Sequence, residues 1–194
     1  TDLDMEDFNL YMSNLDYSNF IRFCQEKGKI HIYHKKDFFV KQNGNSEFVA
    51  WIKKGTFRYT CVGKDNKEHI VGYAFAEEFA CDYSSFINQS VSLVNIQAMS
   101  ECVVYKLSYQ DVVAYWETDM ETLRFGKRTA DALYEMVYKR LLDVFCNSPE
   151  ESYLNLMKRC PDLKEKVSLK EIASYLRVTP TTVSNIRKKI TFGN

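Results

Sequence analysis

The chain has 194 residues, of which 45% are hydrophobic and 14% aromatic, and its 26 basic and 26 acidic side chains cancel. This composition supplies a packed core and excludes a disordered or fibrous chain, and no apolar run reaches the roughly 20 residues of a membrane span. Six cysteines lie far apart without a CxxC pair, and the acidic N-terminus lacks the basic-then-apolar order of a signal peptide. We therefore expect a cytoplasmic protein with no metal centre and no cofactor.

The N-terminal part of the chain changes from a helical to a β pattern at Gly28. Apolar residues at helical spacing predict that residues 1–28 are mostly helical, with Gly28 ending the last helix. From there the period becomes two, and the tracts 43–45 (Asn-Gly-Asn) and 63–66 predict a hairpin turn and a second turn. Six to eight short strands between residues 29 and 107 predict an antiparallel β-barrel or jelly roll.

After Ser108 the helical period returns for about 40 residues and carries one row of apolar and small side chains. A helix of this length extends past the surface of a small barrel, so we expect its row to pack against a second copy, like a coiled-coil seam. Packing against the chain's own barrel is the alternative. The predicted homodimer interface consists of Leu123, Gly126, Ala130, Leu133, Val137 and Leu141.

The C-terminal segment has the pattern of a helix-turn-helix. Ser168 and Glu171 form a capping box that begins one short amphipathic helix, and Thr179 followed by Pro180 begins a second. Residues 147–194 carry nine basic and five acidic side chains (+4), which leaves 17 basic and 21 acidic (−4) for the rest. A basic module at one end of a neutral chain is typical of nucleic-acid binding.

The second helix of this pair has two different faces at about 100° per residue. Val183, Ile186 and Ile190 share the apolar face. The opposite face and its flanks carry small polar and basic residues, which suit base edges and phosphates respectively. These are Thr181, Ser184, Asn185, Lys188, Arg187 and Lys189. An amphipathic hairpin with a solvated basic face is the structural alternative, and a scaffold domain with a degenerate DNA motif is another.

Three stretches of this chain resemble the Crp/Fnr family of bacterial transcription regulators. They are SPEESYLNLMKR (148–159), SLKEIASYLRVTPTTVSNIRKKI (168–190) and WIKKGTFR (51–58). The resemblance implies an α+β chain whose N-terminal barrel or jelly roll is similar to a cyclic nucleotide-binding domain. It also implies a long dimerisation helix and an all-α, winged-helix-type helix-turn-helix domain. We place these parts at residues 1–119, 120–147 and 148–194.

The resemblance also implies roles for residues of the DNA-binding motif. The positions that match the family's base-reading residues are Pro180, Thr181 and Asn185, and those that match phosphate-contacting residues are Lys170, Thr179 and Thr182. The implied partners are a palindromic double-stranded DNA site, a second copy of the chain and, as a further candidate, RNA polymerase. A glycine is common in the family where Arg177 stands, so we expect either a strained positive φ at Arg177 or a different turn.

The effector position departs from the family's cyclic-nucleotide pattern. Members that bind cyclic nucleotides carry a glutamate for the ribose and an arginine for the phosphate, and the corresponding positions here are Asp82 and Ser92. Without the arginine a buried phosphate loses its strongest charge-assisted bonds, so we do not expect cyclic AMP or GMP. The candidate pocket consists of Phe79, Asp82, Tyr83 and Ser92. It holds an apolar or uncharged small molecule or is filled by the chain's own side chains. A regulator that responds to a cyclic nucleotide or another small ligand through a divergent pocket is the alternative.

A metal-dependent enzyme of the cupin type is the alternative from another functional class. It requires several histidines on one face, whereas this chain has His31, His34 and His69. On a strand, residues 31 and 34 point to opposite faces and cannot share one metal ion without a bulge. Since no nucleophile motif or phosphate-binding glycine loop is present either, we expect no catalytic residues and a regulator that is not an enzyme.

Overall fold

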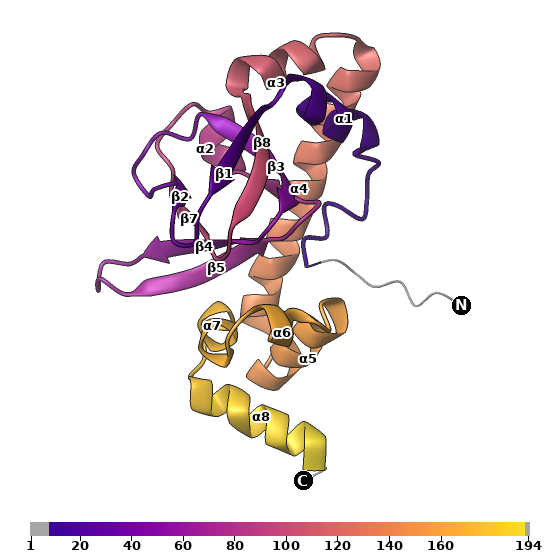
Figure 1. The fold of residues 1–194 in the computed structure, drawn as a ribbon. Coiled ribbons are helices and arrows are strands. Elements are labelled where there is room, and N and C mark those ends of the chain that lie inside the picture. The colour runs from indigo at the N-terminus through magenta and orange to yellow at the C-terminus, as the bar shows by residue number, and fades with distance from the viewer. Residues whose placement is uncertain (1–7, 193–194) are drawn as a thin grey trace. The chain divides into compact units, whose positions relative to one another are not determined.

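The computed structural model describes residues 8–192, which form two compact units (Figure 1). The sandwich unit comprises Leu15–Thr129, and the helical unit combines residues 8–14 with residues 130–192. The chain therefore passes between the units twice, at residues 14–15 and again at residues 129–130, inside a long helix. Within residues 8–192, every helix is too short or too polar to span a lipid bilayer.

The sandwich unit consists of two four-stranded sheets with the strand orders β1-β8-β3-β6 and β2-β7-β4-β5. All the strand pairs are antiparallel. The strands are β1 (Lys29–Tyr33), β2 (Phe38–Val40), β3 (Phe48–Lys54), β4 (Phe57–Val62), β5 (Glu68–Ala74), β6 (Phe79–Ala80), β7 (Asn95–Ala98) and β8 (Cys102–Ser108). The helices of this unit are α1 (Ser18–Lys27), α2 (Tyr83–Ile87), α3 (Tyr109–Trp116) and the first part of α4 (Met120–Cys146).

This architecture confirms the α+β class and the double-sheet arrangement but not a closed barrel. Each sheet ends in two edge strands, β1 and β6 in one and β2 and β5 in the other, and no ladder in the described residues joins the two sheets. The predicted hairpin at residues 43–45 is also wrong. The backbone does turn there, with φ 67° at Asn43, but β2 pairs with β7 while β3 pairs with β6 and β8. The flanking strands thus enter different sheets.

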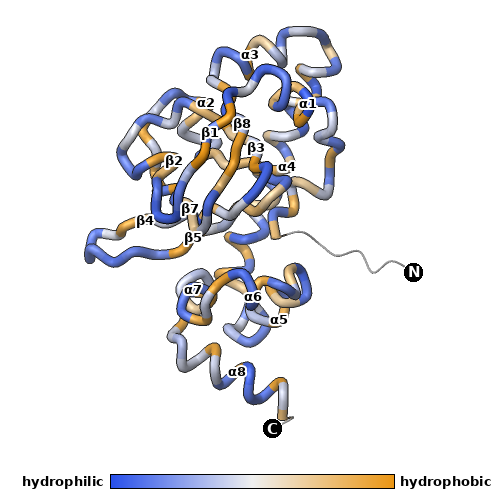
Figure 2. The backbone as a smooth tube through the Cα atoms, in the orientation of Figure 1, coloured by the Kyte–Doolittle hydropathy of each residue, from blue (hydrophilic) through white to orange (hydrophobic). Residues whose placement is uncertain are grey.

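Alternating residues of the sheets are buried in two layers of core. Figure 2 shows hydrophobic residues along β3 and β8, the central strands of the first sheet. On β3, Ala50 and Ile52 lie between the sheets with Phe57 and other apolar side chains. Val49 and Trp51 face the other way, against apolar side chains of α1, α2 and α3. Burying a side chain such as Val49 or Ile52 contributes about 1.5–3 kcal/mol relative to leaving it exposed. The two layers of core therefore determine which residues of β3 face each side of the sheet.

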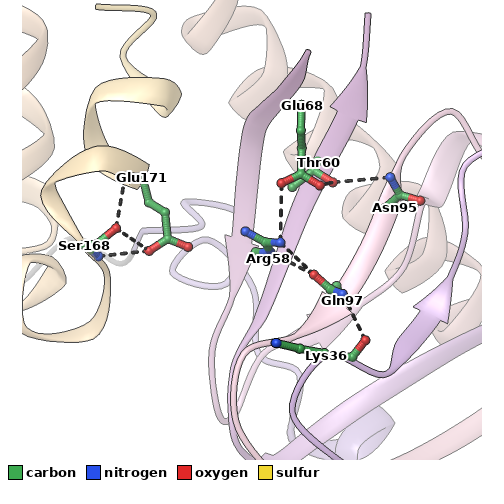
Figure 3. Close-up of polar contacts among 8 residues, drawn as sticks. All are labelled: Lys36, Arg58, Thr60, Glu68, Asn95, Gln97, Ser168 and Glu171. Atoms are coloured by element: carbon green, nitrogen blue, oxygen red, sulfur yellow. Dashed lines mark hydrogen bonds and ion pairs between the residues drawn. The ribbon is translucent and has the colours of Figure 1, made fainter. Parts of the chain in front are cut away.

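A cluster of hydrogen-bonded polar side chains lies on the outer face of the second sheet (Figure 3). Arg58 lies opposite Gln97 and donates from Nε and one terminal nitrogen to its side-chain oxygen, at 3.1 and 2.8 Å. The same terminal nitrogen lies 3.4 Å from the carboxylate of Glu68, which accepts from the Thr60 hydroxyl at 3.2 Å. These side chains link β4, β5 and β7 on the face away from the inter-sheet core.

The N-terminal residues are less helical than the sequence predicts. Residues 8–14 form turns, closed by hydrogen bonds from Met12 N to Asn9 O and from Ser13 N to Leu10 O. Helix α1 begins only at Ser18, and the predicted residues 1–7 lie outside the described part of the chain. Phe8 and Tyr11 are buried. Tertiary packing of aromatic rings therefore overrides the local helical spacing here.

The helical unit contains the second part of α4 and four further helices. Helix α5 begins with a capping box in which Ser148 N donates to the Glu151 carboxylate at 2.8 Å and Glu151 N donates to Ser148 Oγ at 3.3 Å. Its bounds and those of the remaining helices are α5 (Pro149–Arg159), α6 (Leu163–Lys166), α7 (Leu169–Tyr175) and α8 (Pro180–Phe192). From residue 109 to residue 192 there is no strand, so the described residues contain no β-wing.

Candidate DNA interface and effector pocket

Both helices of the predicted helix-turn-helix begin where the sequence places them. Ser168 and Glu171 form the predicted capping box at the start of α7, with Ser168 N donating to the carboxylate at 3.0 Å (Figure 3). Thr179 Oγ1 accepts from Thr182 N at 3.1 Å, and Pro180 occupies the first turn of α8. Such caps satisfy backbone N–H groups that a helix leaves without partners, so the start of α8 is fixed.

The turn between these helices has one of the two backbone conformations expected there. Arg177 has φ 59°. Its N–H donates to Ser174 O at 3.1 Å, and the next N–H, of Val178, donates to Ala173 O at 2.9 Å. This is the pair of bonds that ends a helix in a Schellman motif, where glycine is the usual residue. A side chain in this left-handed conformation costs about 1–2 kcal/mol, which the two bonds and the surrounding packing offset.

Helix α8 divides into a buried and an outward face. Val183 is fully buried and Ile186 nearly so, and the helix packs against α7 and α5. Thr181, Asn185 and Lys188 are exposed. The third predicted apolar contact differs, because Ile190 in the last turn is 47% exposed. The polar face that the periodicity predicts is thus open to solvent over the first three turns of the helix.

Several of the predicted DNA contacts are already engaged within the helical unit. Arg187 Nε donates to the hydroxyl of Tyr153 at 2.9 Å, and Lys189 Nζ lies 2.7 Å from the carboxylate of Glu150. Both partners belong to α5, so these two basic side chains hold α8 on α5. Lys170 on α7 and Lys188 are exposed cations, while Ser184 is only partly exposed. Sequence periodicity alone does not separate these two groups of basic residues.

The carboxylate of Asp82 is surrounded by donors from its own chain. Its Oδ2 lies 2.8 Å from Ser85 Oγ, 2.9 Å from Ser92 Oγ and 2.9 Å from the backbone nitrogen of Leu93. Ser92 is fully buried, and its hydroxyl also lies 2.8 Å from Val94 O, so its single proton serves one acceptor at a time. The two predicted effector positions, Asp82 and Ser92, are therefore bonded to each other.

The residues just before Asp82 are also hydrogen-bonded within the fold. Cys81 N donates to the hydroxyl of Tyr59 at 3.0 Å. Burial raises the pKa of the Cys81 thiol well above its usual value, and the neighbouring Asp82 carboxylate raises that pKa further. The thiol is therefore protonated and unreactive at neutral pH. Phe79 and Tyr83, the other predicted pocket residues, are partly buried on either side of this segment. We call residues 77–83 the cassette.

One backbone position of the cassette resembles Arg177. Glu77 has φ 71°, a left-handed backbone conformation in which glycine is the usual residue. Its N–H donates to Ile52 O at 2.8 Å, and Glu78 N donates back to Phe75 O at 3.2 Å. The turn therefore keeps the backbone path of a glycine turn although the residue carries a side chain.

Helix α4 exposes much of the predicted dimer row. Leu123, Val137 and Leu141 are each more than half exposed, and Ala130 and Leu133 are partly exposed. Gly126 has a neighbour within the chain instead, because a Cβ there would lie 2.6 Å from Nε1 of Trp116. Further large apolar side chains on the same helix are exposed, namely Met120, Tyr134, Tyr138, Leu142, Val144 and Phe145.

The histidines and acids do not gather into a metal site. His31 packs its ring 4.4 Å from that of Tyr33, and His34 is exposed in the turn that follows β1. Within residues 8–192, no group of three or more His, Cys, Asp or Glu side chains is arranged to hold a metal ion.

Comparison with known proteins identifies the architecture. Residues 30–119 match the family described as "Cyclic nucleotide-binding domain". The solved structure of FixK2 from Bradyrhizobium japonicum superposes with a TM-score of 0.71 at 14% identity, covering 86% of each chain. The chain has the fold of Crp/Fnr regulators. A search of curated protein sequences gave no match.

Two further structures extend the likeness over most of the chain. A protein from Eubacterium rectale ATCC 33656 that is ascribed to the Crp/Fnr family of transcriptional regulators has a TM-score of 0.67 at 12% identity, covering 93% of this chain and 86% of the other. CLP of Xanthomonas campestris, described as a c-di-GMP responsive global regulator, has a TM-score of 0.63 at 16% identity, covering 92% and 93%. The Crp/Fnr fold thus includes both the sandwich and the helical unit.

Proposed function

We propose that this chain is a sequence-specific DNA-binding transcription regulator of the Crp/Fnr type, acting as a cytoplasmic homodimer without catalytic activity. The observation that carries the proposal is the outward polar face of α8, on a helix whose start and whose seating on α5 are both fixed. A rigid helix with exposed small polar and basic side chains is suited to the major groove. The fold of the regulators described above supports the same assignment.

The residues of α8 then divide by chemistry. Thr181 and Asn185 are exposed near the start of the helix, and they would meet base edges, which are read by hydrogen bonds. Lys188 and, on α7, Lys170 would meet phosphates, which fix position without reading sequence. Because Arg187 and Lys189 are bonded to α5, their main role would be to hold α8 in place, with phosphate contact secondary.

The exposed row on α4 supports the homodimer. Large apolar side chains on a helix surface mark an interaction site rather than a solvated face, and the exposed members run from Met120 to Phe145. A second copy of α4 carries the same row and would cover it symmetrically. Two α8 helices related by such an axis would enter major grooves about 34 Å apart, which predicts a palindromic site.

The internal bonds of the cassette support an effector other than cyclic AMP or GMP. A nucleotide ribose would have to compete with the three donors that Asp82 Oδ2 already has, and its phosphate would find Ser92 in place of a cation. Breaking these partly buried hydrogen bonds without an equal replacement costs up to about 1–3 kcal/mol for each group. We propose that the sandwich unit responds to a different small molecule or is closed by its own side chains.

A selection of random duplex DNA on the purified full-length protein tests the proposal. We expect enrichment of a palindrome with half-sites one helical turn apart, at near-physiological salt. If enrichment requires cell extract, an effector is needed. Weak, sequence-blind and strongly salt-dependent binding under both conditions would contradict the proposal and favour a scaffold role.

Three variants then test the face of α8 on the selected site. Asn185→Ala should lose about 5- to 100-fold in affinity for that site and relax preference at one base position. Lys188→Ala should weaken binding to all sequences and reduce its salt dependence by about one phosphate contact. Lys164→Ala removes an exposed cation from α6 instead and serves as the control. If neither α8 variant differs from this control, α8 does not lie in the groove.

A further inference from the structure

Phe8 is buried inside the helical unit, more than 120 residues away in sequence from the helices around it. Its ring centroid lies 5.4 Å from that of Tyr175 on α7. The guanidinium carbons of Arg140 on α4 and Arg159 on α5 lie 5.0 and 5.7 Å from the same ring, and Phe8 is 2% exposed. One aromatic ring therefore contacts three helices of the unit that carries α8.

The backbone beside this ring is held as well. A terminal nitrogen of Arg140 donates to Phe8 O at 3.0 Å and to Asn9 Oδ1 at 3.0 Å. The guanidinium thus fixes the segment through its ring, its backbone and the next side chain, and Asn9 is itself buried. Arginine supplies several donors in a rigid plane, so this geometry holds one orientation of the segment.

The other end of the same segment is anchored in the sandwich unit. Tyr17 is buried, and its ring centroid lies 5.6 Å from that of Phe79 and 5.4 Å from that of Phe125. Burial raises the pKa of the Tyr17 hydroxyl to about 12. Phe79 belongs to the cassette and stands three residues before Asp82. Tyr17 is therefore packed directly on the part of the sandwich unit that is the candidate effector site.

The chain between the two anchors is short. Nine residues could span roughly 30 Å if fully extended, but the turns at residues 9–13 shorten this segment. The turns would have to open before the segment could reach its full length, so it limits how far Tyr17 and Phe8 can move apart. Covalent connection thus links an anchor beside the cassette to an anchor among α4, α5 and α7.

We propose that residues 8–17 are a regulatory tether, a second link besides α4, through which the state of the cassette shifts α7 and with it α8. This inference rests on the proposed DNA-binding function for its consequence, but the mechanical link stands on its own contacts. Phe8 and Tyr17 are positioning residues within it. The tether predicts that a substitution at Tyr17 alters the dynamics of α7 only while the Phe8 ring is packed among α4, α5 and α7.

Amide hydrogen exchange on the full-length protein tests the link without any DNA. Phe8→Ala should speed exchange of the α7 amides about tenfold and leave the β3 and β8 amides unchanged. Phe38→Ala, which removes a more exposed ring from β2, should leave α7 unchanged. If Phe8→Ala proves too unstable, Arg140→Lys keeps a cation near the ring but loses the rigid donor plane, and it should speed α7 exchange less. Unchanged α7 exchange in both variants overturns the tether.

A double-mutant cycle separates coupling from a purely structural role. Tyr17→Leu should change α7 exchange in the wild-type background by at least about threefold and should have no effect on α7 in the Phe8→Ala background. Independent, additive effects would overturn the proposal. The same variants are then measured for affinity to the selected DNA. If no DNA site is found at all, the proposed function fails while the exchange cycle still decides the tether.

Discussion

The cassette and the outer face of α8 are both rich in polar side chains, but they use them in opposite ways. Asp82 accepts three hydrogen bonds from its own chain, whereas Thr181, Asn185 and Lys188 face solvent. A group that is bonded inside the fold must lose that bond before it can serve a ligand. A residue at a motif position is therefore not by itself a binding site. Whether its side chain can bind a ligand depends on whether that side chain is already bonded within the fold.

The largest expected effect tests whether the cassette is internally bonded. Asp82→Ala should lower the free energy of unfolding by about 1–3 kcal/mol, because it leaves the Ser85 hydroxyl and the Leu93 backbone N–H without this acceptor, while the Ser92 hydroxyl still has Val94 O. Glu26→Ala on the exposed side of α1 should change it by less than about 0.5 kcal/mol. Chemical denaturation followed by circular dichroism measures both. Equal stability of the two variants would show that the cassette leaves Asp82 available to a ligand.

The next effect separates the two faces of α8. Val183→Ala should destabilise the helical unit by about 1–3 kcal/mol, because it opens a cavity at a fully buried position. Asn185→Ala should stay within about 0.5 kcal/mol of the wild type, although it is the variant expected to lose DNA affinity. Thermal or chemical unfolding of both variants gives the comparison. A strongly destabilising Asn185→Ala would mean that this side chain is structural.

A smaller effect concerns the two side chains in left-handed backbone. Arg177→Gly and Glu77→Gly should each raise the free energy of unfolding by up to about 1 kcal/mol, because relief of a positive φ outweighs the added freedom of the unfolded chain. Lys158→Gly in the last turn of α5 should lower it by up to about 0.5–1 kcal/mol. Denaturation midpoints distinguish the two signs. A loss of stability at Arg177 or Glu77 would indicate that the side chain itself makes needed contacts.

The smallest effect concerns the cap of α5, the helix on which α8 rests. Hydrogen bonds from the backbone N–H and then the hydroxyl of Ser148 hold the pKa of Glu151 below its usual value. The unfolded chain therefore takes up the proton first as the pH falls. The stabilising contribution is present at neutral pH and is lost as the pH drops through the folded-state pKa.

Glu151→Gln checks this sign. It should lower the unfolding midpoint at pH 7 and make no difference well below about pH 4, where both states of the wild type are protonated. Glu165→Gln on α6 removes another exposed carboxylate and serves as the matched control for the change of net charge. An effect of Glu151→Gln that grows toward acid pH would contradict the assignment.

The sequence predicts what depends on neighbours within a few residues. Ser148, Ser168 and Thr179 begin their helices as predicted, because a cap is a contact between positions three apart. The positive φ of Arg177 is one of the two outcomes that the family resemblance implies. Strand pairing does not depend on such near neighbours, and this is why the turn at residues 43–45 was assigned to a hairpin when its flanking strands enter two sheets.

The candidate site could be predicted only in part for the same reason. The outward face of α8 follows from helical period, but the bond from Arg187 to Tyr153 joins residues 34 positions apart. The sequence shows that Ser92 stands where cyclic-nucleotide-binding members carry an arginine. Its hydrogen bond to Asp82 depends on how the ten residues between them fold, so the sequence does not predict it. The burial of Phe8 depends on partners up to 167 positions away, and no local pattern indicates it.

The split of the helical unit across the chain has a consequence for synthesis. Residues 8–14 are translated well before the residues that surround Phe8, because its contacts Arg140, Arg159 and Tyr175 all lie beyond residue 130. At roughly 5–20 residues per second, about 6–24 s pass between translation of Phe8 and of residue 130. The sandwich unit can fold during this interval, while the aromatic side chains of residues 8–14 stay exposed because the helices that bury them are not yet made. A nascent chain stalled before residue 130 would therefore display Phe8 to chaperones and proteases.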